Sequence, residues 1–194
     1  MVKTLMLSVP ITLSIASISA QASENASANC SALQTLSVAN ATLTSAGLVP
    51  AGNGLPEYCR VLGHVDTEIN FELRLPTVWN ERFVFQSYGG LDGVSPSLVQ
   101  TLNIGNPNQP LPLQLGFAEI TTDTGHQSAD GTVYDGSWAY QHPERQINWA
   151  YRSTHVVAIA GKAITEAYYR QAPAFSYYVG CSGGGRHATM SASR

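Results

Sequence analysis

From Arg82 onward, strand-like and helix-like segments alternate along the chain, and this order limits the folds that are open to it. Residues 82–86 and 116–122 are short, mostly apolar runs, which are typical of strands covered on both faces. Residues 156–167 place apolar side chains at helical spacing, and residues 175–179 are aromatic and typical of a strand. Strands that alternate with helices pair in parallel, because each helix returns the chain across the sheet. The order therefore predicts an α/β fold, a mostly parallel sheet with helices on both faces.

The stretch before Arg82 has a different pattern. In residues 69–75, Ile, Phe and Leu alternate with Asn, Glu and Arg, which predicts a strand with one buried face and one face in water. We expect an antiparallel N-terminal pair ahead of the parallel strands. A short helix is also expected near residues 95–102. No domain boundary is evident within residues 23–194, which are therefore treated as one domain.

Residues 1–22 have the three parts of an export signal. Lys3 gives a positive start, residues 5–18 are apolar apart from Ser and Thr, and Ala20-Gln21-Ala22 is a small-x-small cleavage site. The apolar run is shorter than the ~20 residues that a spanning helix needs. We therefore expect a signal peptide at 1–22, a mature chain that begins at Ser23, and a secreted or periplasmic protein with no membrane span.

The net charge argues against some binding functions, and the three cysteines suggest one disulfide. The formal net charge of −3 gives no electrostatic basis for binding nucleic acid or an anionic membrane. In an oxidising compartment, Cys30 and Cys59 can pair, and we expect a disulfide between them. Cys181 is then left over, either as a buried free thiol or with a partner elsewhere.

The segment Gly180-Cys181-Ser182-Gly183-Gly184 is a G-x-S-x-G motif that lies between the strand-like residues 175–179 and a helical segment. This is the setting of a nucleophile elbow, in which glycines let the strand and the helix pass closely and the serine lies at the helix N-terminus. The motif predicts Ser182 as the nucleophile of acyl transfer. The N–H of Gly183 and an N–H of Gly89-Gly90 are the expected donors to the oxyanion, although a Gly-Gly pair can also be a plain tight turn.

Other residues suggest weaker alternatives. Asp123-Thr124-Gly125 is the triplet of aspartic proteases, but those enzymes need two such carboxylates and this chain has one triplet. His126 follows at the carboxyl end of a predicted strand, the functional edge of such sheets, so it is a candidate base. A turn that orients the site is the more common role for such a residue. His187 falls on the helix after the elbow, where proximity to Ser182 alone is a weak argument for a role.

The segment Tyr177–Arg186 resembles the G-C-S-x-G-G-R elbow of the tannase and feruloyl esterase family. Further segments resemble the family in family order: Leu55-Pro56-Glu57-Tyr58-Cys59-Arg60-Val61, Arg74-Leu75-Pro76 with Trp79-Asn80, Gly89-Gly90-Leu91-Asp92-Gly93, Thr122-Asp123-Thr124-Gly125-His126 and His155–Lys162. The resemblance implies an α/β-hydrolase fold and a Ser-His-Asp triad that cleaves small aromatic-acid esters of the feruloyl or galloyl type. It maps the nucleophile onto Ser182 and the oxyanion donors onto Gly183 and Gly90. Relatives often carry a larger residue in place of Gly183, and we expect little effect because only the N–H is needed.

The resemblance also implies what residues 23–194 do not contain. The triad order in this fold is Ser, then Asp or Glu, then His, so the last two are expected beyond Arg194. A lid domain with the family's calcium site is expected there too, as is the cysteine that pairs with Cys181. Within this segment we expect no metal and no cofactor. The segment is then an incomplete α/β-hydrolase domain, and an inactive fragment or remnant of such an esterase is the alternative.

Overall fold

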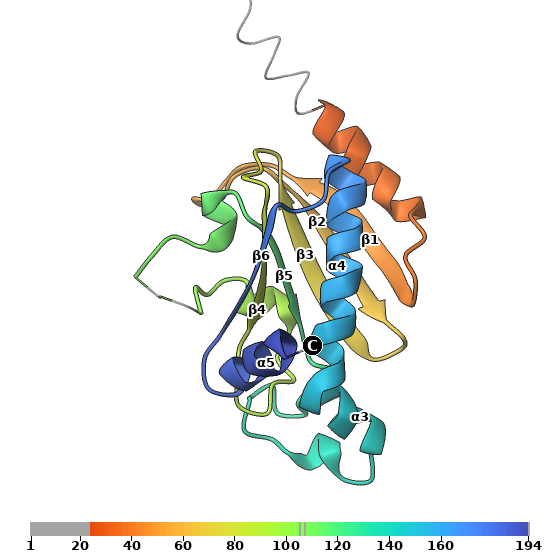
Figure 1. Cartoon of the computed structure of the whole chain (residues 1–194), viewed down its shortest axis with the longest axis vertical. Helices are drawn as coiled ribbons and strands as arrows, with labels where there is room; N and C mark the ends of the chain where they lie inside the picture. The colour runs from red at the N-terminus through yellow and green to blue at the C-terminus, as the bar shows by residue number, and fades with distance from the viewer. Residues whose placement is uncertain (1–23, 105, 107, 194) are drawn as a thin grey trace, which may run out of the picture.

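The computed structural model describes residues 24–104, 106 and 108–193, and it is built on one six-stranded sheet (Figure 1). The strand order is β1-β2-β3-β5-β4-β6. The strands are β1 (Ala41–Val49), β2 (Tyr58–Val65), β3 (Ile69–Pro76), β4 (Arg82–Ser87), β5 (Ala118–Thr122) and β6 (Phe175–Gly180). The signal peptide expected at 1–22 lies outside the described residues, as does Ser23.

The sheet is mixed: its strands from Arg82 onward are parallel, as expected, but the sheet as a whole is not mostly parallel. The pairs β1–β2, β2–β3 and β3–β5 are antiparallel, whereas β4 pairs in parallel with β5 and with β6. The reason lies in residues 77–81, which join β3 to β4. So short a link can reverse the chain, but a parallel crossover needs a dozen residues or more. The antiparallel N-terminal strands were expected, and the structure extends them to three.

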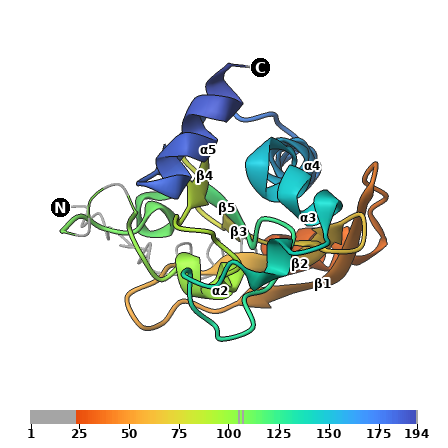
Figure 2. The ribbon, with the colours of Figure 1, turned by 90° about the horizontal axis from the view of Figure 1, so that it is seen from below.

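Helices lie on both faces of the sheet (Figure 2). The helix α4 (Ser153–Tyr169) and the helix α5 (Gly183–Ala192) lie on one side, and the short helix α2 (Pro96–Val99) lies on the other. The remaining short elements are η1 (Leu33–Thr35), η2 (Pro112–Leu115), η3 (Ser137–Ala139), α3 (Pro143–Ile147) and the π-helix η4 (Asn148–Arg152), and residues 24–32 are also helical. A Cβ at Gly161 of α4 would lie 2.5 Å from Ile120, so this glycine lets the helix pack closely on β5.

The alternation of β3 assigns its side chains to the two faces. Ile69, Phe71, Leu73 and Leu75 belong to the apolar core, together with Phe83, Phe85, Ile120 and residues of α4. The opposite face, expected in water, is instead covered. Glu72 is fully buried and Arg74 is 6% exposed. Burial is tolerated here because Glu72 pairs with Arg74 at 2.7 Å and with Arg60 at 2.8 Å.

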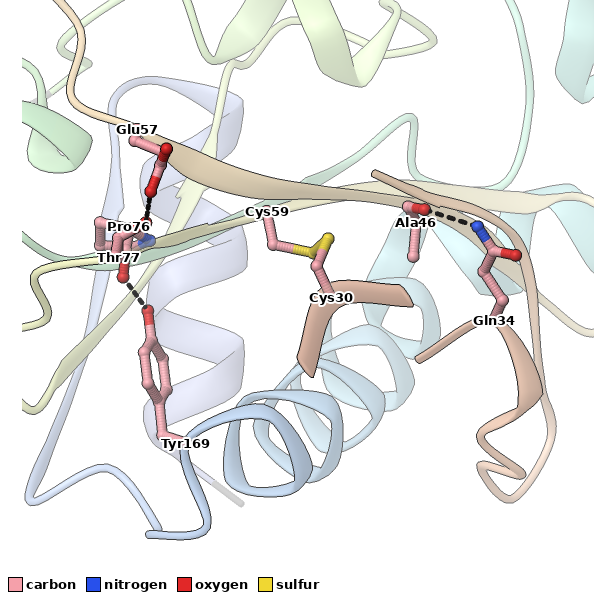
Figure 3. The surroundings of a disulfide bond; sticks show 8 residues. All are labelled: Cys30, Gln34, Ala46, Glu57, Cys59, Pro76, Thr77 and Tyr169. Atoms are coloured by element: carbon pink, nitrogen blue, oxygen red, sulfur yellow. Dashed lines mark hydrogen bonds between the residues drawn. A yellow bond between two sulfur atoms is a disulfide. The ribbon is translucent and has the colours of Figure 1, made fainter. Parts of the chain in front are cut away.

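A disulfide attaches the N-terminal helical residues to the sheet (Figure 3). Cys30 and Cys59 of β2 are joined, with their Cα atoms 5.6 Å apart, and both are fully buried. At the same end of β2 and β3, the Tyr169 hydroxyl of α4 donates a hydrogen bond to the Pro76 carbonyl at 2.7 Å. Within the described ranges, none of the helices has both the length and the apolar character needed to cross a membrane.

Candidate active site

Ser182 lies in the tight turn between β6 and α5. Its backbone has φ +54° and ψ −120°, a conformation that residues with a Cβ rarely adopt. Two backbone hydrogen bonds hold the turn: the Gly184 N–H donates to Cys181 O at 2.9 Å, and the Arg186 N–H donates to Ser182 O at 3.1 Å. Ser182 is exposed, and it is the residue from which α5 begins. The turn has the strained strand-to-helix geometry that a nucleophile elbow requires.

The glycines of the motif are required by contact between backbones. A Cβ at Gly180 would lie 2.2 Å from Gly184 O, where β6 passes the start of α5. A Cβ at Gly184 would lie 2.4 Å from Ser87 O, at the end of β4. Real side chains do not tolerate such distances to backbone atoms, so only glycine allows these three segments to meet. The glycines of the motif therefore stand where β4, β6 and α5 pack most closely around Ser182.

The loop of residues 88–93, which follows β4, lies directly against the start of α5. A Cβ at Gly183 would lie 2.6 Å from Gly90 O and 2.9 Å from Gly90 N. Gly89 and Gly90 adopt positive φ values of 142° and 60°. Among the residues that the structure describes, neither the Gly90 N–H nor the Gly183 N–H has a hydrogen-bond acceptor. The structure thus brings Gly90 and Gly183 together beside Ser182, with both N–H groups free.

His126 supports the 88–93 loop from the side of β5. Its Nε2 lies 3.0 Å from Leu91 O, and its ring stacks on Trp138 with centroids 3.7 Å apart. Because a carbonyl only accepts, Nε2 carries the proton. Burial lowers the pKa of His126 to about 4, so the ring is neutral at ordinary pH. Of the two roles considered for His126, the geometry matches the one that orients a turn.

The Ser182 hydroxyl has no hydrogen-bond partner among residues 24–104, 106 and 108–193. His187 is fully buried and faces Asp92, with Nε2 3.3 Å from Oδ1. His64 bonds the Asp66 carbonyl, and His155 is exposed on α4. None of these histidines contacts Ser182 in the described part of the chain. The described residues therefore present a candidate nucleophile and two free N–H groups, but no histidine hydrogen-bonded to Ser182.

Asp123 does not form the carboxylate pair of an aspartic protease. Its side chain accepts hydrogen bonds from the Asn70 amide at 2.6 Å, the Gly125 N–H at 3.0 Å and the Gln127 amide at 3.1 Å. No second carboxylate is among these partners, and burial raises the pKa of Asp123 to about 6. The side chain instead closes the turn that carries His126.

No group of three potential metal ligands (His, Cys, Asp or Glu) lies close enough together to hold an ion in the part of the chain that is described. Cys181 is a free, exposed thiol in this structure. Cys181 is therefore not buried by the described residues, and its pairing with a partner elsewhere stays a prediction.

Comparison with known proteins identifies the family. The family described as tannase and feruloyl esterase matches residues 55–194, which include the whole elbow and the 88–93 loop. This chain belongs to the tannase and feruloyl esterase family. Two solved structures are similar to this chain: an esterase of Aspergillus oryzae, at 27% identity, and feruloyl esterase B of the same fungus, at 28% identity. Each aligns with a TM-score of 0.68, over 83% and 84% of this chain and 34% of the fungal one.

Two bacterial relatives are closer in sequence. An uncharacterised esterase of Xanthomonas campestris is 35% identical over 185 residues, which is 88% of this chain and 30% of that protein. The mono(2-hydroxyethyl) terephthalate hydrolase of Piscinibacter sakaiensis is 35% identical over 152 residues, or 72% of this chain and 25% of that enzyme. The chain thus spans about a quarter to a third of the length of these family members.

Sequence analysis missed one pair of residues at this site, Asp92 and His187. Asp92 was noted only within the glycine-rich segment that resembles the family, and His187 only for its place after the elbow. The two are 95 residues apart in sequence, and a single buried contact leaves no periodic pattern. The one available signal was that each follows a glycine-rich turn assigned to the oxyanion site.

Proposed function

We propose that this chain carries the nucleophile and the oxyanion-binding half of a serine carboxylic ester hydrolase, with Ser182 as the nucleophile. The observation that carries the proposal is the strained Ser182 turn, which lies next to two free N–H groups at Gly90 and Gly183. A positive φ is strained for a serine, and a nucleophile elbow is a setting that imposes it. Membership of a family of esterases supports the same conclusion.

In the proposed reaction, Oγ of Ser182 attacks the ester carbonyl carbon while a base takes its proton. The carbonyl oxygen becomes an oxyanion that accepts hydrogen bonds from the N–H groups of Gly183 and Gly90. Collapse of this intermediate breaks the ester C–O bond while the base passes its proton to the leaving oxygen, so a neutral alcohol departs and an acyl group stays on Ser182. Water then attacks the acyl-enzyme, releasing the carboxylic acid and restoring the serine.

The described residues provide no base in contact with Ser182, so the proposal includes a histidine and an acidic residue from outside them. The family resemblance implies both, together with a lid that carries a calcium site. Without such a base a serine hydroxyl is a poor nucleophile. An inactive remnant of an esterase is therefore the competing proposal, and activity measurements separate the two.

The strand order supports the finer proposal of an α/β-hydrolase fold. The three strands β5, β4 and β6 are parallel, and the nucleophile follows β6 at a strand-to-helix turn. The preceding antiparallel strand β3 lies beside β5. In such a fold the turn after β4 lies next to the nucleophile and supplies an oxyanion donor, which matches the place of the 88–93 loop.

We further propose small esters of aromatic acids as substrates, in a secreted or periplasmic setting. Two relatives are named for such chemistry, one as a feruloyl esterase and one as a terephthalate ester hydrolase. The Cys30–Cys59 disulfide supports an oxidising compartment. No residue among those described distinguishes a feruloyl from a galloyl or terephthaloyl group.

The test compares the full-length protein, which includes the proposed base, with its Ser182→Ala variant on methyl ferulate, methyl gallate and a p-nitrophenyl ester. The matched control is Ser193→Ala, which alters an exposed serine near the end of the same helix. We expect turnover of at least one aromatic ester, loss of that turnover in Ser182→Ala and no change in Ser193→Ala. Equal activity in the wild type and Ser182→Ala contradicts the proposal, and a wild type that folds but lacks any turnover supports the inactive remnant.

A further inference from the structure

Asp92 and His187 form a buried contact between the two segments that flank the proposed oxyanion site. Asp92 belongs to the 88–93 loop, and His187 lies on α5. Nε2 of His187 is 3.3 Å from Oδ1 of Asp92, and the side chains are 0% and 4% exposed, respectively. The reaction proposed above uses neither side chain.

The direction of this hydrogen bond follows from the groups involved. An ionised carboxylate only accepts, so Nε2 of His187 carries the proton and donates to Asp92. Nη2 of Arg186 also lies 3.3 Å from this nitrogen, but a guanidinium has only donors and cannot bond a protonated Nε2. Arg186 instead donates to the carbonyls of Ala150 at 2.6 Å and Trp149 at 3.1 Å.

The backbone of Asp92 adopts an unusual conformation that its side chain can maintain. Its φ is +49°, in the left-handed region that favours glycine. Gly90 and Gly93 of the same loop also have a positive φ. A residue other than glycine keeps such a conformation only where contacts with the surrounding structure hold it there. Here both carboxylate oxygens are engaged, because Oδ2 accepts from the Ser87 hydroxyl at 3.3 Å while Oδ1 faces His187.

The pair connects the two oxyanion donors through one helix. His187 follows Gly183 by four residues, so both lie on the same face of α5. The Asp92 N–H donates to Gly89 O at 3.0 Å, which closes the turn that contains Gly90. A shift of the Asp92 side chain therefore moves the Gly90 N–H relative to the helix that bears Gly183.

We propose that Asp92 and His187 are a positioning pair that holds the Gly90 N–H in place for the oxyanion formed at Ser182. This inference rests on the proposed function, in which Gly90 and Gly183 stabilise that oxyanion. Donors must lie about 2.7–3.1 Å from the developing charge, so a displaced loop loses the interaction even when substrate still binds.

The experiment uses the full-length protein and two readouts, hydrogen exchange of the amides in residues 89–93 and the kinetics of Ser182-dependent ester hydrolysis. In His187→Leu, we expect loop exchange about 10-fold faster than in the wild type, and kcat lower by about 10- to 100-fold with KM within twofold. In His187→Gln, whose amide can donate to Asp92, both readouts should return toward wild-type values. Ile164→Val, a core change in α4 away from the loop, is the control for general destabilisation.

Asp92→Gly provides a second route to the same test, since glycine accepts the positive φ but lacks the carboxylate. We expect the same faster loop exchange and lower kcat in Asp92→Gly, which keeps the test possible if His187→Leu does not fold. Unchanged loop exchange in these variants, faster exchange with unchanged kcat, or a His187→Gln variant as impaired as His187→Leu each overturns the positioning role. Absence of Ser182-dependent turnover in the wild type overturns the proposed function instead, and the exchange data then still decide whether the pair holds the loop.

Discussion

His126 illustrates how a residue chosen for one role can have another. Its place after β5 made it a candidate base, but the ring stacks on Trp138 and its Nε2–H donates to Leu91 O. Burial disfavours the charged ring and lowers the pKa of His126 to about 4, although the hydrogen bond to Leu91 opposes this fall. The residue therefore acts on the site through the 88–93 loop rather than through Ser182.

The low pKa of His126 makes stability depend on pH. In the unfolded chain the residue titrates near its ordinary value of 6.5, whereas the folded protein resists protonation down to about 4. Between these values the unfolded state binds more protons, so the wild type should lose stability as pH falls, by at most about 3 kcal/mol at pH 4. His126→Gln, whose amide can still donate to Leu91, should lack this loss.

Urea unfolding at pH 7, 5.5 and 4.5 checks this expectation, with His155→Gln as a control for an exposed histidine. As pH falls, the unfolding free energy of the wild type should decrease relative to that of His126→Gln. Parallel pH profiles for the two proteins contradict the prediction.

At the scale of elements, the face of the sheet that carries α2 is buried although it is polar. Glu119 of β5 is fully buried, and its Oε1 accepts from the Gln86 amide of β4 at 2.9 Å. Within the described residues Oε2 of Glu119 has no hydrogen-bond partner. Burial raises the pKa of Glu119 to about 7, although the charge of Arg74 and the bond from Gln86 oppose this rise. The adjoining strand β3 avoids the same problem because Glu72 has its arginine partners.

Glu119→Gln should stabilise the protein at alkaline pH. The unfolded glutamate ionises near 4.5 and the folded one near 7, so the folded state holds the extra proton between these values. Wild-type stability should therefore decline from pH 4.5 to 7, by at most about 3 kcal/mol, and stay level above it. The neutral amide removes this decline, so the variant should gain most over the wild type at pH 8 and least at pH 4.5.

Unfolding free energies at pH 4.5, 6 and 8 test the effect, and Glu166→Gln, on the exposed side of α4, is the matched control. If the gain in unfolding free energy of Glu119→Gln over the wild type does not grow with pH, the raised pKa of Glu119 is contradicted.

At the scale of the whole molecule, the N-terminal residues depend on a few attachments to the sheet. The Cys30–Cys59 disulfide joins residues 29 positions apart, and the Gln34 amide donates to Ala46 O of β1 at 2.8 Å (Figure 3). In the chain-entropy account, such a bridge stabilises the fold by limiting the unfolded chain. Because both sulfurs are buried in the core, the bridge also anchors Leu33 and its neighbours against β2.

The double variant Cys30→Ser and Cys59→Ser should unfold more easily than the wild type, by about 2–5 kcal/mol. Urea unfolding without reductant measures this loss. Reductant should lower the stability of the wild type more than that of the double variant. Ser193→Ala, which alters an exposed serine, is the control and should match the wild type. A double variant as stable as the wild type shows that the bridge contributes little.

Much of the fold could be predicted from local patterns. Helix α4, strands β4, β5 and β6 and the elbow glycines were all foreseen, because the period of apolar residues and the steric needs of a tight turn are properties of neighbouring residues. Strand β1 was not foreseen, since on this edge strand only Ala46 is buried and no apolar alternation marks it.

Tertiary structure decided the features that depend on residues far apart in sequence. The direction of β3 against β5, the burial of the polar face of β3 and the Asp92–His187 contact all join separate segments of the chain. Each depends on which surfaces meet after the sheet assembles, and a single pairwise contact leaves no periodic signal in the sequence. For that reason Ser182 could be recognised from its motif, whereas the pair proposed to position the Gly90 N–H emerged only from the folded chain.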